Sequence, residues 1–130
     1  MRLVAGLVLG LTLAGPALAQ DVPVETAKLK GQAITLHVYP FLTEQDLTTL
    51  RLVMTNKQAL DLFITSKGFS AIAVAPNEGF IVDGAPARSA VAIGDFASRE
   101  EAAAAALAGC EEKRQGGEAC VVILEVGPAS

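Results

Sequence analysis

The chain has 130 residues, of which 52% are hydrophobic and 18% are charged, and its formal net charge is −4 at pH 7. This length predicts one domain. The acidic balance argues against binding to nucleic acid or to anionic membrane surfaces, since both attract basic patches. Protein partners and small-molecule ligands remain open.

The first nineteen residues have the features of an export signal. Arg2 supplies a positive charge, an apolar run follows it, and residues 17–19 (ALA) give the small-x-small pattern that precedes signal cleavage. The apolar run is shorter than the roughly 20 residues that a membrane-spanning helix needs. We therefore expect a signal peptide over residues 1–19, cleaved between Ala19 and Gln20. A periplasmic or secreted location follows, with no stable membrane insertion after cleavage.

The next two segments differ in their patterning. Residues 20–31 are polar, contain one proline and show no period, which predicts a flexible N-terminal arm. Residues 32–39 alternate, which predicts a half-buried strand that ends at Pro40. The alternation places three aliphatic side chains on one side and three more polar ones on the other: Ile34, Leu36 and Val38 against Thr35, His37 and Tyr39.

Residues 43–64 have helical signals. Thr43 is a typical N-cap, and carboxylates follow it in the first turn, where they favour a helix N-terminus. Asn56 interrupts the pattern and is itself a capping residue. The segment is therefore either one bent helix or two short ones.

A hairpin is predicted next. Residues 69–75 and 80–83 resemble strands, and the tetrad Pro-Asn-Glu-Gly between them is typical of a turn. Residues 89–93 (SAVAI) are expected to add a further strand or to extend one.

The last third of the chain predicts a helix and a strand. Ser98 and Glu101 have the spacing of a capping box, and an alanine-rich segment of high helix propensity follows them. Gly116 and Gly117 end the helix. Residues 119–126 (ACVVILEV) then form a buried strand.

The order strand, helix, strand, strand, helix, strand predicts an α+β domain over residues 32–128 with a ferredoxin-like βαββαβ fold. In that fold both helices cover one face of an antiparallel sheet. The opposite face would present Thr35, His37 and Tyr39. Apolar surface there needs a cover, which residues 84–95, a second subunit or a ligand would provide.

The two cysteines, Cys110 and Cys120, predict a structural disulfide, because an even number of cysteines in an exported chain usually pairs. A redox-active pair usually has the closer C-x-x-C spacing. A metal site needs further ligands, and the only histidine, His37, is distant in sequence. We therefore expect no metal site.

His37 and Tyr39 are the candidate catalytic residues. A histidine beside polar neighbours on a strand can act as a general base, a proton sensor or a ligand anchor. A surface or structural imidazole is the reading that we favour, since no nucleophile motif or nucleotide-binding motif accompanies it. The sequence thus favours a non-catalytic module that binds a protein or small ligand and needs no cofactor. The alternatives are a small enzyme that uses His37 and a structural envelope protein.

Three segments, FSAIAVAPNEGF, SREEAAAAALAGC and ACVVILEV, resemble a group of small secreted bacterial domains of unknown function. The segments GQAITLHVYPFLTEQDL and EGFIVDGAPARSAVAIG resemble exported alphaproteobacterial proteins, some of which are labelled 5-aminolevulinate synthase. That activity requires a large pyridoxal-phosphate fold with a Schiff-base lysine, which a small exported acidic domain does not provide. The resemblance therefore implies no activity, and only the cysteines carry over.

Overall fold

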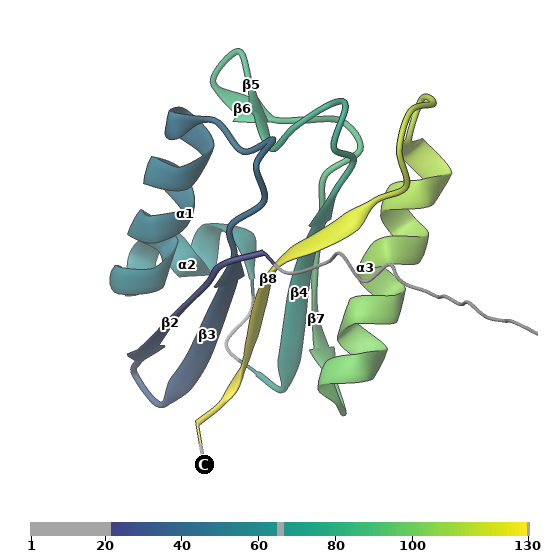
Figure 1. Cartoon of the computed structure of the whole chain (residues 1–130). Coiled ribbons are helices and arrows are strands. Elements are labelled where there is room, and N and C mark those ends of the chain that lie inside the picture. Colours follow the sequence, from purple (N-terminus) through teal and green to yellow (C-terminus); the bar gives the residue numbers. More distant parts are fainter. Residues whose placement is uncertain (1–21, 65–66, 130) are drawn as a thin grey trace, which may run out of the picture.

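The computed structural model describes residues 22–64 and 67–129, and its centre is a five-stranded antiparallel sheet (Figure 1). The expected signal peptide and its cleavage point between Ala19 and Gln20 lie outside the described residues. The sheet has the order β2-β3-β8-β4-β7. Its strands are β2 (Val24–Leu29), β3 (Gln32–His37), β4 (Phe69–Val74), β7 (Val91–Phe96) and β8 (Val121–Pro128). The helices are α1 (Glu44–Thr55), α2 (Lys57–Phe63) and α3 (Arg99–Lys113), and β5 (Ile81–Val82) pairs with β6 (Ala85–Pro86).

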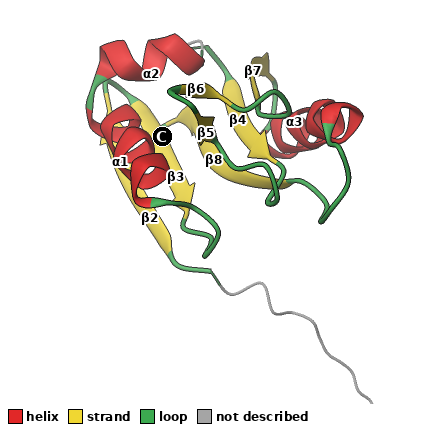
Figure 2. Ribbon diagram, turned by 90° about the horizontal axis from the view of Figure 1, so that it is seen from above, coloured by secondary structure: helices red, strands yellow, loops and turns green. Residues whose placement is uncertain are grey.

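The mixed α+β class and the antiparallel sheet are confirmed, but the ferredoxin-like topology is wrong. The strand order differs, and the helices do not share one face: α1 and α2 lie on one side of the sheet and α3 on the other (Figure 2). The physical reason is visible in β4, where residues 71–74 (AIAV) are apolar and buried, so that both faces of the strand are apolar. A strand that is apolar on both faces needs a cover on both sides.

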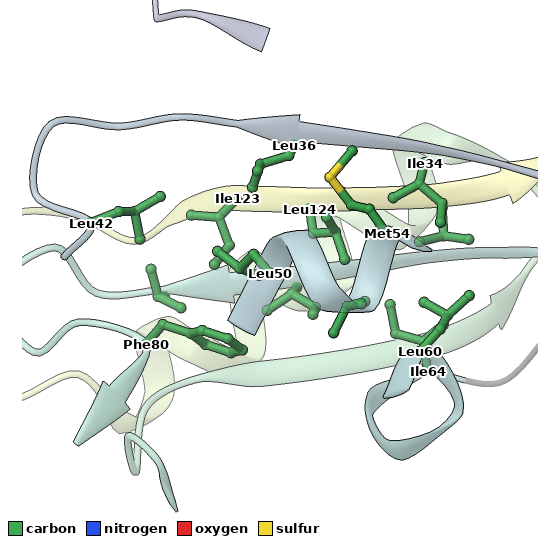
Figure 3. Packing of buried hydrophobic residues seen from close by; sticks show 14 residues of the cluster. Ile34, Leu36, Leu42, Leu50, Met54, Leu60, Ile64, Phe80, Ile123 and Leu124 are labelled. Carbon is green, nitrogen blue, oxygen red and sulfur yellow. The ribbon is translucent and has the colours of Figure 1, made fainter. Parts of the chain in front are cut away.

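The larger core lies between the sheet and the first two helices (Figure 3). Ile34 and Leu36 point from β3 toward Leu50 of α1, and Leu60 of α2 extends the same cluster. All four side chains are fully buried. Burial of each such side chain contributes about 1.5–3 kcal/mol, so this layer holds most of the apolar stabilisation.

The second core, under α3, consists of small side chains. Ala71 and Ala73 of β4 face Ala102 and Ala106 of α3, and all four are completely buried. Side chains of this size let a helix approach the sheet closely. The small side chains of this core thus give a thin layer between helix and sheet, which is consistent with the low aromatic content of the chain.

The expectation of a flexible arm over residues 20–31 is corrected: β2 lies within this segment and forms an edge strand against β3. A two-residue turn joins them, with positive φ at Lys30 and Gly31 (52° and 82°), as type I′ hairpin turns require. Ala27 and Leu29 reach the larger core. The alternation in β2 is weak because an edge strand that is open on one face needs few large apolar residues.

The expected hairpin between residues 69–75 and 80–83 is also corrected. A turn does follow Ala75, but β4 pairs with β7 instead. Phe80 is buried in the larger core, and Asp46 accepts a hydrogen bond of 3.0 Å from the amide of Ile81. These contacts draw residues 80–83 away from the sheet, and β7 takes the vacant edge of β4.

The helix signals are confirmed. Asn56 separates α1 from α2 and caps the second helix, so the segment contains two helices. Thr43 and Asp46 form a reciprocal capping box at α1. At α3 the Ser98 hydroxyl accepts a hydrogen bond of 3.1 Å from the amide of Glu101.

Candidate functional site

Helix α3 covers only part of its face of the sheet. Strand pairing aligns Thr26, Thr35, Glu125 and Ala71 in one row across four strands. Ala71 is buried in the cluster beneath α3, whereas Thr26 is exposed. We call the part of this face outside α3 the polar half-face; it comprises Thr26, Lys28, Thr35, His37 and Glu125. Strands β2 and β3 carry mostly polar side chains on this face, and their apolar residues there are the exposed Val24 and the small Ala33, so they provide little apolar surface for a helix.

Glu125 is the centre of the polar half-face. Its Oε1 atom lies 2.9 Å from His37 Nε2 and 3.0 Å from Arg99 Nη2, and its Oε2 atom accepts from Arg99 Nε at 3.2 Å. The Glu125 side chain is only 15% exposed. The carboxylate therefore binds an arginine from α3 and a histidine from β3.

These contacts explain the acidity of the carboxyl group. The hydrogen bond from His37, together with the hydrogen bond and charge of Arg99, lowers the pKa of Glu125 from 4.5 to about 2, against the opposing effect of burial. Glu125 is therefore ionised at neutral pH and only accepts hydrogen bonds, so the His37 Nε2 atom is the donor. This fixes the orientation of the imidazole ring.

Local sequence places Arg99 correctly for this contact. Ser98 caps α3, so Arg99 is the first helical residue and lies where the helix begins beside β8. A cation is unfavourable at a helix N-terminus, and Glu125 offsets that cost. Sequence reasoning missed both residues. The available signal was Glu125 itself, a single charge within the apolar run VVILEV.

Tyr39 does not continue the row that the alternation predicted. Strand β3 ends at His37, and the Tyr39 ring stacks on Phe41 with a centroid distance of 5.6 Å. Burial, and to a lesser extent the charge of Glu125, raise the pKa of the Tyr39 hydroxyl. The Tyr39 backbone amide donates to the His37 carbonyl at 3.1 Å, but among the described residues no side-chain hydrogen bond joins Tyr39 to His37 or Glu125. The structure therefore brings together His37, Glu125 and Arg99, without Tyr39.

A small cavity of about 170 Å³ lies beside the carboxylate and is lined in part by Thr35, Arg99 and Glu125. Phe69 forms another wall by lying on Gly127. A Cβ atom at Gly127 would lie 2.5 Å from the Phe69 ring, so only glycine permits this contact. The cavity is large enough for a few waters or one small polar group.

The predicted disulfide between Cys110 and Cys120 is present, with an S–S distance of 1.98 Å and a Cα–Cα distance of 6.2 Å. It joins the end of α3 to the start of β8. Glu111 supports the same junction, because its Oε2 atom accepts a hydrogen bond of 2.7 Å from the Cys120 amide. The disulfide lies apart from His37 and serves the packing of α3.

Within residues 22–64 and 67–129, no group of three or more histidine, cysteine or carboxylate side chains is arranged to hold a metal ion. In the same part of the chain no helix has the length and apolar character to span a bilayer. Comparisons of the chain with protein-family models, with curated proteins and with solved structures find no match. The candidate site is therefore defined by its own geometry.

Proposed function

We propose that the protein is a small exported, non-catalytic module that binds a protein or small ligand through the polar half-face. The observation that carries the proposal is the fixed cluster of His37, Glu125 and Arg99 on the uncovered part of a sheet that is otherwise covered by helices. Rigid polar groups beside uncovered strands are suited to recognition, since little order is lost when a partner docks.

The charge of the surface indicates what kind of partner fits. Lys28 and Arg99 together outweigh the one carboxylate of the half-face, Glu125, so this surface has an excess of positive charge in a chain whose formal net charge is −4. The Arg99 side chain is 56% exposed and retains donors for a partner. A partner with carboxylate or other acceptor groups is therefore favoured.

Two observations support an exported location. The N-terminal segment has the pattern of a signal peptide. The disulfide between Cys110 and Cys120 is of a kind that persists in oxidising compartments such as the periplasm. Together they make the periplasm or the exterior the place where a partner is to be sought.

The proposal is tested by NMR with the ¹⁵N-labelled protein purified from the periplasm. The small-molecule and the macromolecular fractions of a periplasmic extract are added separately. We expect one fraction to shift the amide signals of Thr26, Thr35 and Glu125 and to leave those of α2 unchanged. A Thr35→Arg variant, which fills the half-face, is expected to abolish the shifts. Shifts confined to other surfaces, or none in either fraction, would contradict the proposal.

One observation favours a second candidate, a small hydrolytic enzyme. A histidine oriented by a carboxylate is the arrangement that many general bases use. However, no hydroxyl or thiol among the described residues is hydrogen-bonded to His37, so the imidazole would itself have to attack or activate water. Hydrolysis of p-nitrophenyl acetate distinguishes the two functions. Turnover that a His37→Gln variant loses supports the enzyme, whereas equal background rates in both proteins rule it out.

A further inference from the structure

A second cavity, of about 610 Å³, lies at the end of the molecule that Figure 2 views from above. It is separate from the polar half-face. The β5–β6 hairpin forms one wall, the turn after β4 forms another, and the loop closed by the disulfide forms the third. Its volume is in the range typical of sites for small organic ligands.

The hairpin contributes an apolar wall and one cation. Val82, Pro86 and Ala87 line the cavity, and Val82 is 45% exposed. Arg88 lies next to them and forms no hydrogen bond or ion pair with any described residue. A guanidinium with five free donors beside an apolar wall is arranged to receive an acceptor from outside the protein.

Glu78 also lines the cavity, but it forms no ion pair with Arg88, because both of its carboxylate oxygens are held by neutral donors. Glu78 Oε1 accepts from the Ser89 hydroxyl at 2.5 Å, and Oε2 accepts from the Gln115 amide at 2.8 Å. These two hydrogen bonds are the main reason that the pKa of Glu78 is lowered, and the charges of Arg114 and Arg88 contribute less. Glu78 therefore serves as a cross-link between the walls. Arg88 also lines a neighbouring hollow together with Glu112 and Lys113. The charges of these two side chains are opposite to each other.

The disulfide-closed loop supplies further donors. The amides of Gln115 and Glu118 are bound by the side chains of Glu78 and Asn77, at 2.8 Å each. Between them, the amides of Gly116 and Gly117 donate to no described residue, and both glycines line the cavity. The loop is held in place at Gly117, whose carbonyl accepts from Arg114 at 2.8 Å.

We propose that this cavity binds a small organic carboxylate with an apolar body. The carboxylate accepts hydrogen bonds from Arg88 and from the amides of Gly116 and Gly117, and the apolar body lies against Val82 and Pro86. Capture of a carboxylate by a guanidinium and consecutive backbone amides is a known recognition mode. A free acid and the C-terminus of a peptide present the same chemistry.

The test is an NMR titration of the ¹⁵N-labelled protein with hexanoate, and with hexanol as a probe that lacks the carboxylate. We expect hexanoate to shift the amide signals of Gly116, Gly117 and Ala87, and hexanol to leave them unchanged. An Arg88→Gln variant is expected to bind hexanoate at least roughly tenfold more weakly, as loss of a charged hydrogen bond implies. An Arg51→Gln variant, which alters a surface arginine on α1, is the matched control and should bind as the unmodified protein does.

Three results would overturn the proposal: no shifts with millimolar hexanoate, equal shifts with hexanol, or equal affinity in the Arg88→Gln variant. A further arm uses the tripeptide Ala-Ala-Val with a free or an amidated C-terminus. Tighter binding of the free tripeptide than of hexanoate supports the proposal with peptide ends as the source. Weaker binding supports it with free acids as the source.

Discussion

Replacing Glu125 by glutamine keeps the shape of the side chain and removes its charge, so the variant measures what the charged cluster contributes to stability. A pKa lowered from 4.5 to about 2 corresponds, at about 1.4 kcal/mol per unit, to an upper limit of about 3 kcal/mol. Arg99 is 56% exposed, and solvent screening of that partner reduces the expected contribution to about 1–2 kcal/mol.

The stabilisation by Glu125 depends on pH in a defined direction. The pKa of Glu125 is lower in the folded than in the unfolded chain, so its contribution is complete above about pH 4.5 and is lost as the pH falls toward 2. Urea denaturation followed by circular dichroism at pH 7 and near pH 2 measures it. We expect Glu125→Gln to lower the free energy of unfolding by about 1–2 kcal/mol at pH 7 and hardly at all near pH 2.

A matched control is Glu25→Gln, which breaks an ion pair with Arg51 in which the carboxylate side chain is 40% exposed, against 15% for Glu125. We expect a smaller loss there, because exposed pairs contribute little. The reasoning on Glu125 is refuted if its variant is destabilised equally at both pH values, or is not destabilised at pH 7.

Three further changes test the packing that supports the site. Reduction of the Cys110–Cys120 disulfide should lower the melting temperature by roughly 10 °C, from about 3 kcal/mol of loop entropy, and detectable free thiols in the native protein would contradict the pairing. Asp46→Ala leaves two backbone amides without an acceptor and should cost about 2–3 kcal/mol in urea denaturation; a loss near zero would contradict its role. Gly127→Ala should cost about 1–3 kcal/mol by displacing Phe69. The cost should shrink when Phe69 is also replaced by alanine, and simple additivity of the two changes would count against the contact.

Local signals in the sequence predicted the elements that depend on local physics. The cap at Thr43, the break at Asn56 and the cap at Ser98 are each decided within one helical turn. The disulfide was predictable because its two cysteines flank a single helix-to-strand connection, a separation of 10 residues. Strands β3 and β8 had the expected apolar patterns.

Non-local contacts decided what the sequence could not predict. The turn signal after Ala75 suggested local pairing, but Phe80 and the contact of Asp46 with Ile81 drew the chain toward α1. The side on which α3 packs depends on the alanines at alternate positions of β4, which are compatible with a helix on either face. The pairing of strands across the whole sheet decides which face α3 covers.

The candidate site shows the same limit. His37 was singled out because it is the only histidine, but its carboxylate partner is 88 residues away, and Arg99 is 26 residues from Glu125. Tyr39 was wrongly placed in the row because the strand ends earlier than the alternation does. Proximity of this kind follows from strand register, which short-range patterns do not encode.

The central claim, that the polar half-face is the binding surface, is tested most directly by photocrosslinking in living cells. A benzoylphenylalanine residue is introduced at Thr26 and, as a control, at Leu62, which is 81% exposed on α2. We predict a discrete adduct from position 26 that a Thr35→Arg change abolishes, and none from position 62. Equal labelling from both positions, or an adduct that persists with Thr35→Arg, would contradict the account.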